Sequence, residues 1–384
     1  FIYRVASKKL GARAGTCLAA GYIFNPAVII NSASWGQVDS VLILFMVLAI
    51  YCFIKRKCAL GVFSYLAGLL VKPQALIFAP IMLFGAIKGM IECGQDLRKP
   101  EKKDIARKRV LAFTGSMLCS VAIFFGLSWL FMPDGANILW LFEHYFKTMS
   151  EYPWGTLSAF DFFGLIGGQW VSIKQGEFLG ISYEAINVIM TALAIAIPTF
   201  LYWIKRVRAK NGKIIYKIEP KNRTMFLAAA VIAAGVATLP AMVHERYMFP
   251  ALALILMAFV VYKDRRLIYA YAGLSGIHYI NVGLVLYAYG GKAYTGNEAQ
   301  SYMTADNPFM IIGSLLICLL FIYLVYVAFS IRNGHIKEFE PIAAGAGDEA
   351  FSPITLRDES LKNELYEKEL ILHAAGSNAP GEED

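Results

Sequence analysis

Apolar runs separated by short polar segments fill most of this chain, and many of the runs approach the length of a membrane-spanning helix. We expect ten such helices, at residues 14–30, 39–54, 58–71, 74–88, 110–132, 183–204, 224–242, 248–262, 267–289 and 308–331. The predicted fold class is therefore an all-α integral membrane protein with about ten transmembrane helices.

Two segments break this pattern. Residues 133–182 form an outer loop rich in aromatic residues and glycine, and so long a loop is expected to lie in the membrane interface or to re-enter the protein. Residues 332–384 are predicted to form an acidic cytoplasmic tail, mostly disordered, with one surface helix at Thr355–His373. The polytopic transmembrane domain is then residues 1–331. Because the chain opens at Phe1 rather than Met, we expect this domain to be N-terminally truncated.

Composition and charge narrow the class further. The chain is 58% hydrophobic and 17% charged, with a mean hydropathy of +0.53, which is typical of a membrane protein. Its net charge of +8 does not indicate nucleic-acid binding, because the alternating spans place 26 of the 36 Lys and Arg residues on one side and 5 on the other. This asymmetry follows the positive-inside rule, so the basic loops are predicted to face the cytoplasm and its lipids.

The turn at Lys72-Pro73-Gln74 is the first candidate for chemistry. The apolar runs on either side would be about 21 Å long as helices, whereas the bilayer core is about 30 Å thick. Lys72 is therefore predicted to lie below the membrane surface, where it either faces a polar cavity or an anion, or snorkels to the surface. Pro73 suits the first position of the following helix, whose N-terminus favours a bound phosphate.

Further polar residues gather at the same predicted face. In His244-Glu245-Arg246, the imidazole and guanidinium can donate charge-assisted hydrogen bonds to a phosphate and the carboxylate can orient either one. The alternative is a turn that merely places charges in water. Asp39, the next-to-last residue of the polar segment 31–40, can likewise be a site residue or a helix cap.

Two polar residues lie one turn apart inside a predicted span. His278 and Asn281 either line the same cavity or bond a neighbouring helix, and we favour the structural interpretation.

Three segments, taken in order, resemble a known family. Asn25–Ser40, Leu70–Ala75 and His244–Pro250 are similar to bacterial polytopic glycosyltransferases of the GT-C class, and above all to the bacterial relatives of GPI mannosyltransferase II. The segment Tyr152–Asp161 also looks like that group, which often has Asn at the position of Asp161. A more distant resemblance is to the dolichyl-phosphate-glucose glucosyltransferases.

The resemblance implies a GT-C-like inverting hexosyltransferase. It would move mannose or glucose from a polyprenyl-phosphate-sugar donor to a lipid, glycan or protein acceptor, on the non-cytoplasmic face of the plasma membrane. The residues expected to hold the donor phosphate are Lys72, Gln74, His244 and Arg246. Those expected to support them, or to bind sugar or acceptor, are Trp35, Gln37, Tyr152, Asp161 and Glu245. The usual general base would lie upstream of residue 1, and Asp39 is the substitute candidate. No cofactor or metal is expected.

Two rival functions would also place polar groups in a membrane protein. A transporter or flippase of lipid-linked sugars needs a phosphate site too, but it is expected to show inverted repeats or matching broken helices, which this sequence lacks. A non-catalytic membrane scaffold would explain the spans, but not the polar motifs gathered at one face.

Overall fold

The computed structural model describes residues 1–137, 139–149, 151–208, 213–290 and 304–339. Within residues 1–339, which form one compact unit, the structure is mostly helical. The predicted surface helix at Thr355–His373 falls outside the described residues.

The α-helices are α1 (Ile2–Leu10), α2 (Ala12–Ile23), α3 (Pro26–Ile29), α4 (Asp39–Ile54), α5 (Cys58–Val71), α6 (Ala79–Leu97), α7 (Lys103–Leu130), α8 (Trp140–Met149), α9 (Phe162–Leu165), α10 (Tyr183–Trp203), α11 (Met225–Thr238), α12 (Phe249–Tyr262), α13 (Arg265–Gly290) and α15 (Pro308–Arg332). Short π- or 3₁₀-helical turns are η1 (Ile30–Ser34), η2 (Pro73–Phe78), η3 (Pro100–Lys102), η4 (Asn222–Thr224) and η5 (Glu245–Met248). The strands are β1 (Thr156–Leu157), β2 (Glu177–Phe178), β3 (Ile181–Ser182), β4 (Ile204–Arg208), β5 (Ile214–Ile218) and β6 (Val243–His244), which pair as β1 with β6, β2 with β3 and β4 with β5.

The described residues make a polytopic membrane protein, with fewer spans than expected. Five helical segments are long and apolar enough to cross a membrane, and α2 with α3 and η1, bent by 48°, makes a sixth if the pair is one span. The five are Pro73–Leu97, Pro100–Leu130, Tyr183–Trp203, Glu245–Tyr262 and Pro308–Arg332. The prediction of about ten is therefore wrong. The apolar helices α4, α5 and Asn222–Thr238 have only 14 to 17 residues, about 21–26 Å.

The centre of the fold holds apolar helices that other parts of the protein enclose. Nearly every side chain of α11 is buried inside the protein, and so is 83% of the apolar stretch Glu245–Tyr262. A helix that is apolar all round can be surrounded by other helices as well as by lipid. Hydropathy alone therefore does not distinguish these core helices from lipid-facing spans.

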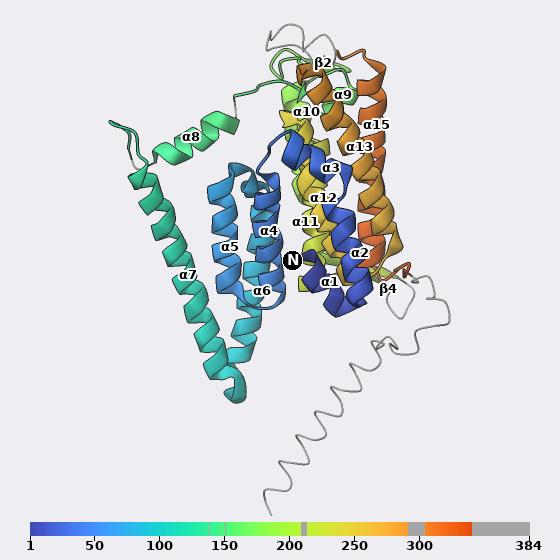
Figure 1. Ribbon diagram of the computed structural model, residues 1–384. Helices are drawn as coiled ribbons and strands as arrows, with labels where there is room; N and C mark the ends of the chain where they lie inside the picture. The colour runs from blue at the N-terminus through green and yellow to red at the C-terminus, as the bar shows by residue number, and fades with distance from the viewer. Residues whose placement is uncertain (138, 150, 209–212, 291–303, 340–384) are drawn as a thin grey trace, which may run out of the picture. The chain divides into compact units, whose positions relative to one another are not determined.

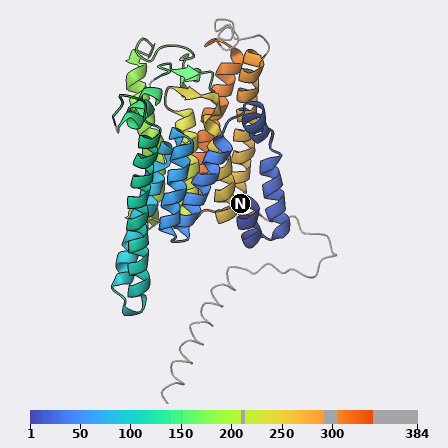
Figure 2. The ribbon, with the colours of Figure 1, turned by 60° about the vertical axis from the view of Figure 1, so that its left-hand side comes forward.

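Helix α7 has the opposite environment. It packs along one side on α5 and α6, and only 6% of its apolar stretch is buried (Figures 1 and 2). Beyond the upper end of α7 in Figure 1, α8 leads back towards the bundle. The Nε1–H of Trp140, the first residue of α8, donates to the Ser128 carbonyl of α7 over 2.7 Å. Most of the surface of α7 thus faces away from the rest of the described chain.

Successive long helices run in alternating directions, which gives the bundle two ends with different chemistry (Figure 1). One end, here called the site end, carries the start of α4, the end of α5, residues 151–182 and the turn between α11 and α12. The other, here called the basic end, carries the turn Lys55–Lys57, the α6–α7 connection and the β4–β5 hairpin.

Residues 151–182 fold into the protein at the site end. Phe160 and Phe163 are buried, and β1 pairs in parallel with β6, next to the turn that begins η5. Phe160 packs so closely on α15 that a Cβ added at Gly313 would lie 2.4 Å from its ring. Residues 151–182, the later part of the predicted outer loop and here called the re-entrant loop, therefore pack into the protein.

Candidate functional site

A buried ion pair joins the start of α4 to the end of α5. Lys72 Nζ lies 2.5 Å from Asp39 Oδ1, and the side chain of Asp39 is 1% exposed while that of Lys72 is 20% exposed. Lys72 is extended, with φ at −157°, and Pro73 follows at the first turn of η2. The lysine therefore leaves the helix pointing into the protein, towards a carboxylate, rather than snorkelling to the surface.

A π-helical turn brings Asn31 to the same carboxylate. In η1 the Trp35 N–H donates to the Ile30 carbonyl over 2.9 Å, five residues back, and such turns are frequent at functional sites. Asn31 is fully buried, and its Nδ2 donates to Asp39 Oδ2 over 3.2 Å. Each carboxylate oxygen of Asp39 thus has one side-chain partner, Lys72 at Oδ1 and Asn31 at Oδ2.

A second ion pair lies in the turn between α11 and α12. Arg246 donates from an Nη atom to Glu245 Oε1 over 3.2 Å, and the Glu245 side chain is 4% exposed. The neighbouring His244 belongs to β6, opposite Leu157 of β1. Burial, with the nearby charges of Arg246 and Lys72, lowers the pKa of His244 to about 3, so its ring is neutral at pH 7.

The two ion pairs belong to one cluster. Asp39 is close enough to Glu245, Tyr247 and His278 to interact electrostatically with each. The ring of Tyr152 packs edge-on against His244 at 5.2 Å, and Tyr247 lies 5.5 Å from the same imidazole. Residues from five distant parts of the chain therefore meet at the site end.

Several buried polar atoms of this region have no hydrogen-bond partner within the described residues. They are Asn31 Oδ1, Trp35 Nε1, Gln74 Oε1, Arg246 Nε, and Nδ1 and Nε2 of His278. The backbone of Glu245 lies beside the His278 ring, but outside the geometry of a formed hydrogen bond. Buried polar groups are rarely left unpaired, and a concentration of them calls for a physical explanation.

The remaining predicted site residues are placed less centrally. Trp35 and Gln74 are next to the cluster in sequence, and each contributes one of the unpartnered atoms. For Gln37 the structure shows a backbone hydrogen bond to Asn31 over 3.1 Å, and none from its side chain in the part of the chain described.

Asp161 lies apart from the cluster, inside the re-entrant loop. Its Oδ1 accepts from the Gly164 N–H over 2.7 Å, which caps α9, and Oδ2 is 2.5 Å from Thr156 Oγ1. Complete burial raises the pKa of this carboxyl well above its usual value, although these hydrogen bonds oppose the shift. Its polar atoms are thus used within the loop.

The paired residues His278 and Asn281 separate in the structure. Asn281 accepts from the Phe160 N–H over 2.9 Å and donates to the Ser158 carbonyl over 2.7 Å, so it fixes the re-entrant loop, as the favoured structural interpretation expects for it. His278 instead joins the cluster around Asp39, which sequence reasoning did not favour. An ionisable residue inside a span was the signal for it, since such residues are often functional.

Within the described residues, no three His, Cys, Asp or Glu side chains are placed to hold a metal ion.

Comparison with known proteins gives one family match. Residues 4–151 match the family model described as GPI transamidase subunit PIG-U, over less than half of the chain. No curated protein matches the chain.

This match corrects the predicted family and function. The chain does not match a GT-C glycosyltransferase family, so hexosyltransferase activity, the polyprenyl-phosphate-sugar donor and the flippase alternative are wrong. Two of the segments that carried the resemblance, Asn25–Ser40 and Leu70–Ala75, lie inside the region that matches the transamidase-subunit model. Short polar turns between spans indicate where a polar group can bind, but they do not identify the reaction.

Proposed function

We propose that the protein is a membrane subunit of a GPI-transamidase-type complex, and that its site end binds the polar headgroup of a GPI lipid. The family match supports the first part, and its range includes Asn31, Asp39 and Lys72. The cluster at the site end supports the second part.

The unpartnered buried atoms are the observation that carries this proposal. Trp35 Nε1 and Arg246 Nε are donors, whereas Asn31 Oδ1 and Gln74 Oε1 are acceptors. The neutral ring of His278 would offer one donor and one acceptor. A sugar hydroxyl both donates and accepts, so the glycan of a GPI lipid fits this mixture of groups.

The charges of the cluster support a glycan over a bare phosphate. Lys72 is paired with Asp39, Arg246 is paired with Glu245, and His244 is neutral at pH 7. The paired cations are largely neutralised, which suits a neutral or zwitterionic group better than a dianion. We therefore assign Lys72, Gln74, His244 and Arg246 to headgroup hydroxyls, with Tyr152 and Tyr247 packing beside them.

The proposed setting follows from the family match and the charge distribution. The matched family favours the endoplasmic reticulum membrane over the plasma membrane. The positive-inside rule would then place the basic end in the cytoplasm and the site end in the lumen. We retain residues 1–331 as the membrane domain and residues 332–384 as a cytoplasmic tail. The partners would be the other transamidase subunits.

Binding of a GPI lipid to the purified full chain tests the proposal. Radiolabelled GPI lipid should bind in competition with unlabelled GPI lipid, and phosphatidylinositol without the glycan should compete poorly. We expect Arg246→Ala to weaken binding roughly tenfold or more, because a hydrogen bond to a charged group is worth about 1.5–3 kcal/mol. Because the pKa of His244 is about 3, protonation of this ring should not change the affinity between pH 5.5 and 7.5.

Lys174→Ala is the matched control, since Lys174 is an exposed lysine of the re-entrant loop at the same end. Equal competition by phosphatidylinositol would show that the glycan is not recognised. If the tagged protein, gently extracted from its own membranes, carries no transamidase activity, the assignment to such a complex is wrong.

A further inference from the structure

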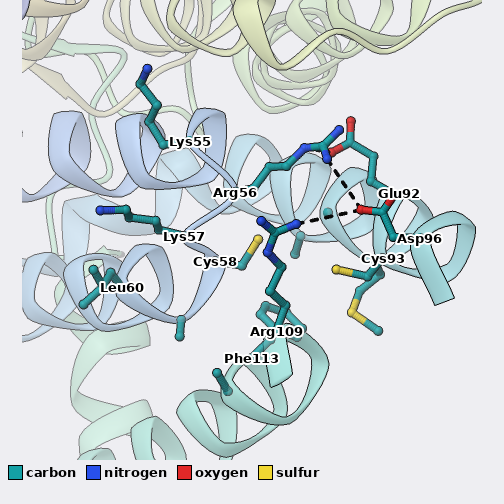
Figure 3. A pocket seen from close by; sticks show the side chains of 15 residues that line it. Lys55, Arg56, Lys57, Cys58, Leu60, Glu92, Cys93, Asp96, Arg109 and Phe113 are labelled. Carbon is teal, nitrogen blue, oxygen red and sulfur yellow. Dashed lines mark ion pairs between the residues drawn. The ribbon is translucent and has the colours of Figure 1, made fainter. Parts of the chain in front are cut away.

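The basic end contains a cavity that the proposed function does not use. Its volume is about 350 Å³, and it lies between the turn Lys55–Lys57, α6 and α7 (Figure 3). This volume falls within the usual range for small-molecule sites.

Two kinds of surface line the cavity. One is apolar and comes from the helices around it: Leu60, Ala86, Met90, Ala112 and Phe113. The other is charged, with the basic residues Lys55, Arg56, Lys57 and Arg109 and the acidic residues Glu92 and Asp96. Four cations against two carboxylates leave the lining net positive.

The carboxylates hold the guanidinium groups in place without using all their donors. Arg56 Nε lies 2.8 Å from Glu92, and Arg56 and Arg109 approach the same oxygen of Asp96 at 3.6 and 3.8 Å. A guanidinium has five N–H donors, so each arginine retains groups for another anion. Both side chains are more than 40% exposed. Lys57 makes no ion pair within the part of the chain described.

The cavity opens beside α7, the least buried of the candidate spans among the described residues. Phe113 and Ala112 belong to α7, whose apolar stretch is 6% buried and presents Leu111 and Leu118 outward. A ligand with an anionic head and apolar chains could place the head among the basic residues and its chains along α7. A free anion would make no use of this apolar wall.

We propose that this cavity binds the phosphate headgroup of an anionic phospholipid from the membrane leaflet at the basic end. Lys57 and Arg109 contact the phosphate. Arg56, which the ion pair with Glu92 holds in position, lies beside them. Basic pockets between helices at a cytoplasmic membrane surface are suited to anionic lipid headgroups. The site is separate from the GPI site at the other end of the helices, and the two can be tested independently.

Thermal unfolding of the full-length protein in detergent, after lipid removal, provides the first test. Dioctanoyl phosphatidylglycerol should raise the melting temperature in a saturable way, because a ligand that binds the folded state stabilises it. Dioctanoyl phosphatidylcholine and inorganic phosphate at the same concentrations should raise it far less. An equal rise in melting temperature with phosphate would show that the ligand is a free anion. An equal rise with phosphatidylcholine would show that the net charge of the headgroup is not recognised. Either result overturns the proposal.

Variants at the cavity locate the effect. Lys57→Gln and Arg109→Gln should each weaken phosphatidylglycerol binding about fivefold, the effect of one cation near an anionic headgroup. Lys103→Gln is the control, since Lys103 is exposed at the same end and does not line the cavity. Unchanged affinity for phosphatidylglycerol in the double variant Lys57→Gln/Arg109→Gln would refute the site. The charged residues would then serve only to fix the α4–α5 turn.

A second readout does not depend on folding stability. Cys93 lines the cavity and is partly exposed, so its labelling by a maleimide can be followed when the other cysteines are replaced by serine. Phosphatidylglycerol should slow this labelling, and phosphatidylcholine should not. Labelling at the same rate with and without phosphatidylglycerol would contradict occupation of the cavity.

Discussion

Removal of Lys72 should be far more damaging than removal of its partner. Lys72→Met leaves the Asp39 carboxylate, 1% exposed, with the Asn31 amide as its one remaining side-chain partner within the described residues. Breaking a buried ion pair in this way costs about 3–5 kcal/mol, because a charge stays buried without its counterion. We expect the lower end of that range, about 3 kcal/mol, since the Asn31 amide still donates to the carboxylate.

Substitution of Asp39 instead leaves the Lys72 ammonium, which can reach water. In Asp39→Asn the lysine, already 20% exposed, can turn its ammonium towards water, so we expect a loss of about 1 kcal/mol. The double variant Asp39→Asn/Lys72→Met contains no buried charge at this position, and should be close in stability to Asp39→Asn. The coupling between the two substitutions is then about 3 kcal/mol in favour of the double variant.

Melting temperatures of the purified proteins, followed by tryptophan fluorescence, measure these differences. The unfolding entropy of a unit of 339 residues is about 0.7 kcal/mol/K, so Lys72→Met should lower the melting temperature by about 4 °C and Asp39→Asn by 1–2 °C. Lys174→Met, at an exposed position of the same end, should change it little. A double variant as unstable as Lys72→Met would refute the reasoning.

Three other predictions follow from features described above. Burial raises the pKa of Asp161 in the folded protein, so the wild type loses stability as the pH rises from about 4 through that pKa. The melting temperature of Asp161→Asn, which has no such carboxyl, should therefore rise relative to that of the wild type between pH 5 and 8. A constant difference between the two melting temperatures would contradict this prediction. Gly313→Ala should cost about 1–3 kcal/mol in unfolding free energy through its clash with Phe160, and an unchanged melting temperature would show that the ring moves freely. In sealed microsomes, an impermeant maleimide should label single cysteines placed in 94–108 and should not label those in 133–182; the opposite pattern would reverse the orientation.

The local limits of several helices could be read from the sequence. The predicted spans 39–54 and 58–71 coincide with α4 and α5, because polar residues bound each apolar run closely. The number of spans could not be read, because the core stretch Glu245–Tyr262, 83% buried, and the exposed helix α7, 6% buried, are both apolar enough to cross a membrane. What separates them is burial by distant segments, which composition does not encode.

The candidate site was predictable as a list of residues but not as an arrangement. Lys72 was correctly placed in a broken turn at the end of a helix, yet its pairing with Asp39 depends on how α4 and α5 are rotated against each other. The same holds for His278, whose orientation on α13 directs it to Asp39 while Asn281 turns to the re-entrant loop. Burial also lowers the pKa of His244, so its ring is neutral at pH 7, and this burial cannot be read from the neighbouring sequence.

The shortness of α4 and α5 has a consequence for the surrounding lipid. Helices of 16 and 14 residues are about 24 and 21 Å long, which is about 6–9 Å too short to cross a bilayer core. Where they face lipid, the apolar surface that they offer is thinner by that amount. Such hydrophobic mismatch is relieved by local thinning of the membrane. Lipid headgroups near this hairpin are thereby drawn towards the depth of Asp39 and Lys72, and a polar headgroup can approach the cluster without being lifted out of the membrane.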